Sequence, residues 1–265
     1  MLIAIDIGNT NTVIGTFQGE KLTATERLAT DRARAQETLV RPFAVALEKV
    51  EAESLTAVEI AIASVVPELS RALEAYIISA THKPPLLINS DVKLPLRLDF
   101  DTPGEVGADR ICNAVAAKEI YQQESEPLVV VDFGTATTFD ILSADGNYIG
   151  GIICPGPKTA VTTLASKAAL LASVQIEPPS AGVIARNTTD ALKSGMFYGT
   201  IGEIEYLLAK IGDELGATPK AIATGGLASI IADHSNLFSA VNPQLTLQGI
   251  RLIADFQGAG SLSNS

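Results

Sequence analysis

The sequence predicts an α/β protein built from two similar domains, each opening with a three-stranded meander. An apolar, β-branched run at residues 2–7 ends in Asp6-Ile7 before Gly8, and a second run at residues 128–131 leads into Asp132-Phe133-Gly134. After each Asp-x-Gly come a Thr-rich turn, a second strand, a Gly-bearing turn and a third strand. Alternating helical and strand-like segments follow in both halves. A whole pattern that occurs twice favours internal duplication over the chance recurrence of a tripeptide.

The first domain is expected over residues 1–121. Strands are expected at residues 2–7, 12–17, 21–28, 58–66 and 86–89, a polar loop at 90–105, and helices at 33–50, from 67 to about 80, and from about 107. Leu39, Phe43 and Leu47 recur at helical spacing and predict the first of these helices. Pro67 ends the apolar strand before it, because proline fits the first turn of a helix better than a strand interior.

The second domain is expected over residues 122–257, because residues 122–127 are polar and end in proline. Strands are expected at residues 128–131, 137–142, 148–154 and 221–223, and helices at 190–212 and 249–256. Residues 258–265 are small and polar, which predicts a flexible tail.

Composition and charge restrict the possible partners. Of the 265 residues, 47% are apolar and 18% are charged, and the net charge is −11. Such an acidic surface repels nucleic acid and anionic membrane, so neither is an expected partner. No apolar run reaches the ~18 residues that span a bilayer, and the N-terminus lacks a basic leader segment, so a cytoplasmic location is expected. Cys112 and Cys154 are expected to be buried, reduced thiols.

The two Asp-x-Gly turns have the chemistry of phosphate binding. Glycine has no Cβ, so the backbone at residues 8–12 and 134–138 can approach a phosphate closely. Successive N–H groups there, with Thr and Asn side chains, form an anion-binding concavity. A carboxylate at the end of each strand suits a hard cation such as Mg²⁺. The P-loop, dinucleotide and protein-kinase motifs are absent. The pair of turns therefore predicts a clamp for ATP and its metal.

Three longer blocks and several short motifs stand out along the sequence. The blocks are Asp6-Ile7-Gly8-Asn9-Thr10-Asn11, Glu105-Val106-Gly107-Ala108-Asp109-Arg110 and Asp132-Phe133-Gly134-Thr135-Ala136-Thr137-Thr138. The short motifs lie at residues 150–156, Asn187-Thr188, Ser194-Gly195, Thr224-Gly225-Gly226 and 245–249. In this order, over nearly the whole chain, they resemble the signature blocks of the type III pantothenate kinase family.

The resemblance implies a fold and a reaction. The fold is that of two duplicated ribonuclease-H-like domains, the actin-like ATPase fold, with the nucleotide cleft between them. The reaction is transfer of the ATP γ-phosphate to pantothenate, giving 4′-phosphopantothenate in the first step of coenzyme A biosynthesis. The resemblance also implies Mg²⁺ with ATP, a monovalent cation (K⁺ or NH₄⁺), and a homodimer with the active site near its interface.

The resemblance assigns roles to individual residues. ATP contacts fall to Asp6, Ile7, Gly8, Asn9, Thr10, Asn11, Thr12, Val13 and Thr135, and pantothenate contacts to Phe100, Gly107, Ala108, Asp109, Arg110 and Thr188. Asp109 is the implied general base, and Asp132 the implied ligand of the monovalent cation. Asp6 is expected to act on Mg²⁺ indirectly.

Elementary chemistry agrees with the role of the Asp109-Arg110 pair. Phosphoryl transfer to an alcohol needs an aligned hydroxyl, a carboxylate to receive its proton, and positive charge at the transferring group. Asp109 stands near a helix start, where the dipole favours a carboxylate. Arg110 can bind the pantothenate carboxylate through two hydrogen bonds. The competing interpretation is a helix cap with a surface ion pair.

Two residues depart from the family pattern. Phe100 stands where a tyrosine is frequent, so a hydroxyl contact to pantothenate is lost, and Ala185 stands where a glycine is usual. Residues outside the blocks are expected at the surface: His82, His234 and Lys158, and a solvated helix face with Arg32, Arg34 and Arg41.

Two other functions remain open from the sequence. The first is a catalytically silent, nucleotide-binding regulator of the same family. The second is a phosphohydrolase of the same superfamily, which would position water in place of an alcohol.

Overall fold

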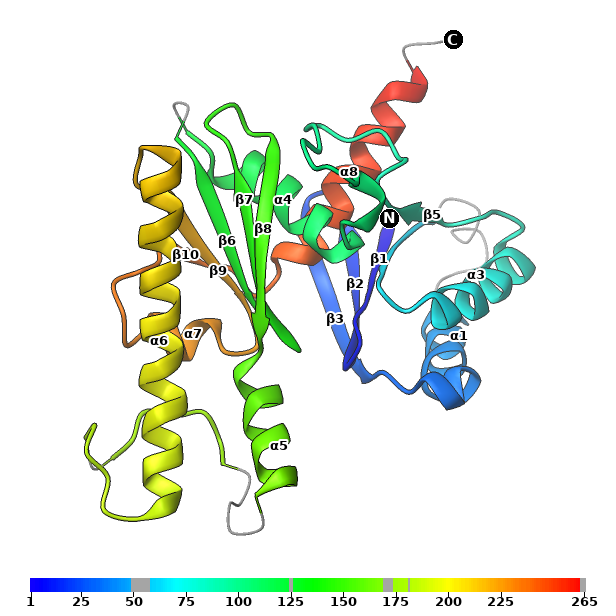
Figure 1. Ribbon diagram of the computed structural model, residues 1–265. Coiled ribbons are helices and arrows are strands. Elements are labelled where there is room, and N and C mark those ends of the chain that lie inside the picture. Colours follow the sequence, from blue (N-terminus) through cyan, green and yellow to red (C-terminus); the bar gives the residue numbers. More distant parts are fainter. Residues whose placement is uncertain (49–57, 124–125, 169–173, 181, 263–265) are drawn as a thin grey trace. The chain divides into compact units, whose positions relative to one another are not determined.

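The computed structural model describes residues 1–48, 58–123, 126–168, 174–180 and 182–262 (Figure 1). Its contacts divide the chain into two units, Met1–Ala116 with Leu245–Ser265, and Ala117–Gln244. The first boundary lies inside a helix, α4 (Ala108–Tyr121), whereas the sequence analysis placed it after residue 121.

The first unit holds a five-stranded sheet in the order β3-β2-β1-β4-β5. The strands are β1 (Leu2–Ile7), β2 (Asn11–Gln18), β3 (Lys21–Ala29), β4 (Glu59–Ser64) and β5 (Leu86–Ile88). The three consecutive strands β1–β3 pair antiparallel; β4 pairs with β1 in parallel, and β5 pairs with β4 in parallel. β1 is thus the central strand, and its carboxyl end lies beside that of β4.

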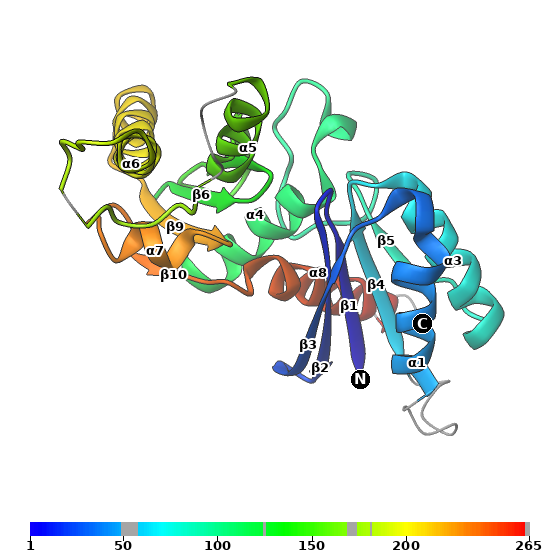
Figure 2. The same cartoon turned by 90° about the horizontal axis from the view of Figure 1, so that it is seen from below.

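Alternation along β1 separates two faces of this sheet. Ile3, Ile5 and Ile7 belong to one buried cluster with side chains from the neighbouring helices. Those helices are η2 (Gln36–Val40, a short π-helix), α1 (Arg41–Glu48) and α3 (Pro67–Thr81). The other face carries small residues, including Ala4, which let α8 (Leu245–Leu262) lie close to β1 and β4 (Figure 2).

Helix α8 corrects the expected domain division. From the sequence, residues 245–257 are expected in the second domain and residues 258–265 in a flexible tail. In the structure the buried side chains of Leu247, Ile250 and Ile253 give α8 an apolar face, and it packs on the first sheet. The helix continues to Leu262, and residues 263–265 lie outside the described residues.

The second unit repeats the topology of the first. Its sheet has the order β10-β9-β6-β7-β8, with β6 (Leu128–Phe133), β7 (Ala136–Leu142), β8 (Tyr148–Pro155), β9 (Lys220–Gly225) and β10 (Ala240–Val241). β6–β8 pair antiparallel, while β9 and β10 join β6 in parallel. Two sheets with the same order and the same strand directions confirm the predicted duplication.

Three helices share the core of the second unit. They are α5 (Pro157–Lys167), α6 (Thr188–Leu215) and α7 (Ala228–Ala232), and each contributes buried apolar side chains to the cluster that includes Val129 and Val131 of β6. Asn187 caps α6 by accepting a hydrogen bond from the Asp190 backbone N–H at 2.9 Å.

The helix predicted over residues 33–50 is divided. The 3₁₀ turn η1 (Arg32–Arg34) comes first, then η2 and α1, and residues 49–50 lie outside the described residues. Within the described residues, none of the helices has both the length and the apolar composition needed to span a membrane.

Candidate active site

The carboxyl edge of the first sheet gathers most of the residues assigned to ATP and catalysis. Asp6 and Ile7 end β1 opposite Ala63 and Ser64, which end β4. The Val65 N–H donates to the Ile7 carbonyl at 3.1 Å. A Cβ built on Gly107 would lie 3.4 Å from a Val65 methyl group, so the start of α4 adjoins the same edge. Ligands of α/β sheets bind at such carboxyl edges.

The turn after β1 is a closed loop of residues 8–11. Its Gly8 N–H donates to the Asn11 carbonyl at 3.0 Å, and a Cβ on Gly8 would lie at the same distance from that oxygen. The Thr30 hydroxyl donates to the Gly8 carbonyl at 2.8 Å, and the Thr30 N–H donates to the Thr10 carbonyl at 2.9 Å. Thr30, which the sequence analysis did not identify, therefore fixes the backbone of the turn.

Side chains in this turn divide into two groups. Asn9 and Thr10 are exposed, whereas Ile7 and Thr12 are buried. The Thr12 hydroxyl lies 3.1 Å from that of Thr30. Ile7 and Thr12 can therefore serve ATP through their backbone and their packing.

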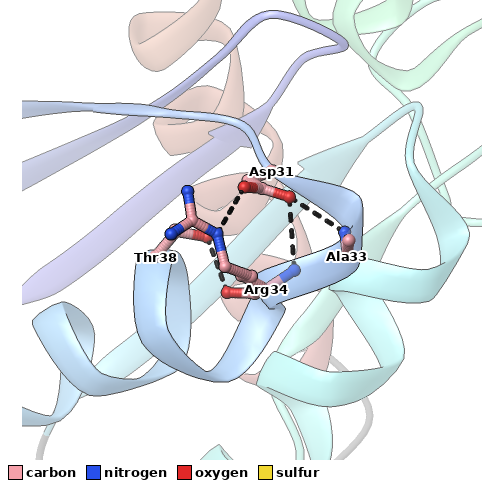
Figure 3. A network of polar contacts seen from close by, with 4 residues as sticks. All are labelled: Asp31, Ala33, Arg34 and Thr38. Carbon is pink, nitrogen blue, oxygen red and sulfur yellow. Dashed lines mark hydrogen bonds and ion pairs between the residues drawn. The ribbon is translucent and has the colours of Figure 1, made fainter.

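The segment after β3, which Thr30 links to this turn by hydrogen bonds, holds a second polar network formed by Asp31, Ala33, Arg34 and Thr38 (Figure 3). The Asp31 carboxylate accepts from the backbone N–H groups of Ala33 (3.0 Å) and Arg34 (3.2 Å) and from Arg34 Nε (2.9 Å). These bonds start η1, and the Arg34 guanidinium holds the pKa of Asp31 below its ordinary value. Arg32 next to it is exposed, as expected, but its guanidinium also donates to Asn9 Oδ1.

Asp109 lies in the first turn of α4, as the sequence predicts. Its Oδ1 accepts from the Arg110 N–H at 2.8 Å. Burial raises the pKa of the Asp109 carboxyl above its ordinary value, although this bond and the Arg110 charge act in the opposite direction. A Cβ on Gly107 would lie 2.5 Å from Asp109 Oδ1, so glycine leaves room for the carboxylate.

The buried thiol of Cys112 is influenced by the charges of both Asp6 and Asp109. Burial raises the pKa of Cys112 well above its usual value, and the negative charges of Asp6 and Asp109 raise it further. Both carboxylates therefore lie close enough to Cys112 to act on it. Cys112 is buried, as expected, whereas Cys154 is only partly buried; both are free thiols.

The remaining residues assigned to pantothenate lie in both units. Phe100, Gly107 and Arg110 of the first unit are partly buried, and Ala108 is buried. Thr188 is exposed in the first turn of α6, in the second unit. His82, His234 and Lys158 are exposed, as the sequence analysis expected.

The turn after β6 in the second unit resembles the first but is shorter. Residues 134–136 lie between the last pair, Phe133 and Thr137, whereas residues 8–11 lie between Ile7 and Thr12. The Gly134 N–H donates to the Ala136 carbonyl at 3.0 Å. The Thr159 hydroxyl of α5 and the Gly156 N–H both donate to the Thr135 carbonyl, at 2.6 and 3.2 Å.

Gly225 makes room for the carboxylate of Asp132. The two residues lie at the ends of the neighbouring strands β9 and β6. Gly225 has φ +86°, and a Cβ there would overlap Asp132 Oδ1 and lie 2.6 Å from the Phe133 nitrogen. Only glycine adopts this backbone without strain.

Within the described residues, no three His, Cys, Asp or Glu side chains gather to hold a metal ion. Single carboxylates at Asp6 and Asp132 nevertheless suit cations that take their other ligands from water and phosphate. Mg²⁺ binds nucleotides in this way, with one or two protein carboxylates.

Comparison with known proteins identifies relatives of the chain. The family model described as type III pantothenate kinase matches residues 2–210. A type III pantothenate kinase of Geobacter sulfurreducens is 40% identical over 260 residues, covering 96% of this chain and 98% of the relative. One from Anaeromyxobacter sp. is 43% identical over 257 residues, with 96% and 98% covered.

Solved structures support the fold. MreB 5 of Spiroplasma citri bound to AMPPNP has a TM-score of 0.56 at 9% identity, covering 100% of this chain and 98% of that one. The activator of the 2-hydroxyisocaproyl-CoA dehydratase from Clostridium difficile with bound ADPNP has a TM-score of 0.55 at 11% identity, covering 100% and 97%. These similarities confirm the predicted actin-like ATPase fold.

Proposed function

The chain belongs to the type III pantothenate kinase family and phosphorylates pantothenate, and we propose that Asp109 is the general base of this reaction. Two observations carry the proposal: the start of α4, which holds Asp109, adjoins the carboxyl edge of the first sheet, and burial raises the pKa of the Asp109 carboxyl group. A carboxylate with a raised pKa holds a proton better in the transition state.

In the proposed reaction the pantothenate hydroxyl attacks the γ-phosphorus of ATP. A new oxygen–phosphorus bond forms, the bond to the β-phosphate oxygen breaks, and ADP leaves. Asp109 accepts the hydroxyl proton. Arg110, the next residue in α4, is suited to bind the pantothenate carboxylate through two parallel hydrogen bonds. Gly107 and Ala108 offer backbone groups to the substrate, Phe100 offers packing, and Thr188 offers a hydroxyl.

ATP phosphates are proposed to bind at the two Asp-x-Gly turns. Residues 8–11 form the first site and Thr135 contributes from the second. The support is the similar local geometry of the two turns: each is closed by a Gly N–H bond, and in each a threonine hydroxyl donates to a backbone carbonyl. Asp6 is suited to orient water ligands of Mg²⁺, which neutralises phosphate charge when bound.

Asp132 is proposed to ligate a monovalent cation, K⁺ or NH₄⁺. We expect activity in K⁺ or NH₄⁺ and little in Na⁺, because K⁺ and NH₄⁺ are similar in size and Na⁺ is smaller. The measurement is initial rate against the concentration of each chloride salt at constant ionic strength. Asp132→Asn should weaken activation by K⁺. Equal rates in all three salts would contradict a cation site at Asp132.

A homodimer is also proposed, with its active sites near the interface. Support comes from the exposed surface of α6, which carries three glycines and two tyrosines: Gly195, Gly199, Gly202, Tyr198 and Tyr206. Small residues allow close packing, and tyrosine is frequent in protein interfaces.

A cytoplasmic location is also proposed. The free thiols Cys112 and Cys154 fit it, because thiols stay reduced in that compartment.

Release of ADP in the presence and absence of pantothenate tests the function. We expect one ADP for each phosphopantothenate formed and little release without pantothenate. Release of ADP and phosphate without an acceptor would indicate a phosphohydrolase. Binding of ATP with no pantothenate-dependent ADP would indicate a regulator.

A further inference from the structure

We infer that Arg32 is a phosphate-binding residue whose guanidinium contacts the ATP phosphates at the first turn. The inference rests on the proposed role of residues 8–11 in binding ATP. Arg32 begins η1, two residues beyond the end of β3, and its Nη2 donates to Asn9 Oδ1 of that turn. The sequence pattern predicts Arg32 on a solvated helix face; the side chain is exposed, but it also contacts the turn.

The position of Arg32 is fixed by its two predecessors in the chain. Thr30 binds the turn through two hydrogen bonds, from its hydroxyl to the Gly8 carbonyl and from its N–H to the Thr10 carbonyl. Asp31 then caps η1 and sets the direction of the chain (Figure 3). These hydrogen bonds fix the backbone on both sides of Arg32. The local fold therefore directs the Arg32 side chain toward the turn of residues 8–11.

Arg32 and Arg34 differ in whether an acidic side chain neutralises their charge. The Arg34 guanidinium forms an ion pair with Asp31, with Nε 2.9 Å from Oδ2. Among the residues that the structure describes, Arg32 forms no ion pair, and its guanidinium hydrogen bond goes to the neutral Asn9 amide. A chain with net charge −11 needs local positive charge to hold a polyphosphate, and Arg32 supplies it at this turn.

The bond to Asn9 also orients the amide. A guanidinium has only donors, so Asn9 must present its oxygen to Arg32, and its NH₂ group then remains a donor for phosphate. Arg32 has further N–H groups in a planar fork that matches phosphate oxygens. Arg32 and Asn9 together therefore bring two kinds of donor to the same exposed turn.

Nucleotide affinity tests this inference. Arg32→Ala should weaken binding of ATP and ADP by about 10-fold or more, as expected for charge-assisted hydrogen bonds, and leave adenosine binding unchanged. Arg32→Lys should retain part of the affinity because the charge remains. Arg34→Ala is the matched control: it removes one positive charge from η1, the element that also holds Arg32, and should leave ATP affinity within about twofold. Calorimetric titration at two salt concentrations gives these values.

The outcomes distinguish a phosphate contact from a structural clamp. Unchanged ATP affinity in Arg32→Ala, or an equal loss for adenosine and ATP, would overturn the inference. Gly8→Ala tests the turn separately, because its Cβ would crowd the Asn11 carbonyl at 3.0 Å. If Gly8→Ala loses ATP affinity and Arg32→Ala does not, the inference fails while the proposed turn stands. If neither variant loses affinity, the proposed turn fails as well.

Discussion

Replacing Asp109 with asparagine is expected to lower kcat by about 10²–10⁴-fold, the usual contribution of a general base. Asparagine has the same shape, and its oxygen can still accept from the Arg110 N–H, so the start of α4 should be retained. It cannot accept the hydroxyl proton. ATP affinity should stay near that of the unchanged chain, because the proposed phosphate contacts lie in other segments. Steady-state kinetics and calorimetric ATP binding measure the two quantities.

Glu119→Gln provides a control for this variant. Glu119 is an exposed carboxylate at the other end of α4, and its neutralisation should leave kcat unchanged. Thermal unfolding of Asp109→Asn should match that of the unchanged chain or exceed it, because a carboxyl group that burial disfavours in its charged form has been made neutral. Normal turnover in Asp109→Asn would exclude it as the base.

Replacing Gly249 with alanine is expected to destabilise the first unit by about 3 kcal/mol or more. Gly249 of α8 packs directly on α4, and a Cβ there would overlap the carbonyl oxygen of Cys112. The obstacle is backbone, so a rotamer change cannot relieve it and the two helices must separate. At 2–4 °C per kcal/mol for a chain of this size, the melting temperature should fall by roughly 6–12 °C.

Gly258→Ala is the matched control on the same helix. Gly258 is exposed, and a Cβ there would meet nothing within 4 Å. Alanine favours a helix over glycine by about 1 kcal/mol, so this variant should be unchanged or slightly more stable. Equal stability of Gly249→Ala and Gly258→Ala would show that α8 does not need its close contact with α4.

Local chemistry made much of this fold predictable. The apolar runs before Asp6 and Asp132 are strands because β-branched residues favour buried sheet, and the glycine that follows each aspartate marks the turn. The repeated order of strand and turn then predicted the duplication that the two sheets show. Asp109 was identified because its block resembles a family motif and opens a helix.

Other features depend on contacts between distant parts of the chain. Helix α8 belongs to the first unit because Gly249 fits against Cys112, 137 positions earlier in the sequence, and no local pattern shows that contact. Arg32 becomes a candidate only when β2 and β3 bring Thr30 back to Gly8. The one available signal was the polar Thr30-Asp31-Arg32 triplet directly after the third strand. Gly225 likewise shows its role only beside Asp132.

The pH dependence of kcat/KM, compared between the unchanged chain and Asp109→Asn, tests the role of Asp109 most directly. Burial raises the pKa of Asp109 above its ordinary value of 3.8. Only the carboxylate accepts a proton, so activity is full above this pKa and falls by about tenfold per pH unit below it. Ionisations of the substrates appear in both profiles, so the difference isolates Asp109. We expect an acidic limb above pH 3.8 that disappears from the residual activity of Asp109→Asn. The same acidic limb in both proteins would contradict a base at Asp109.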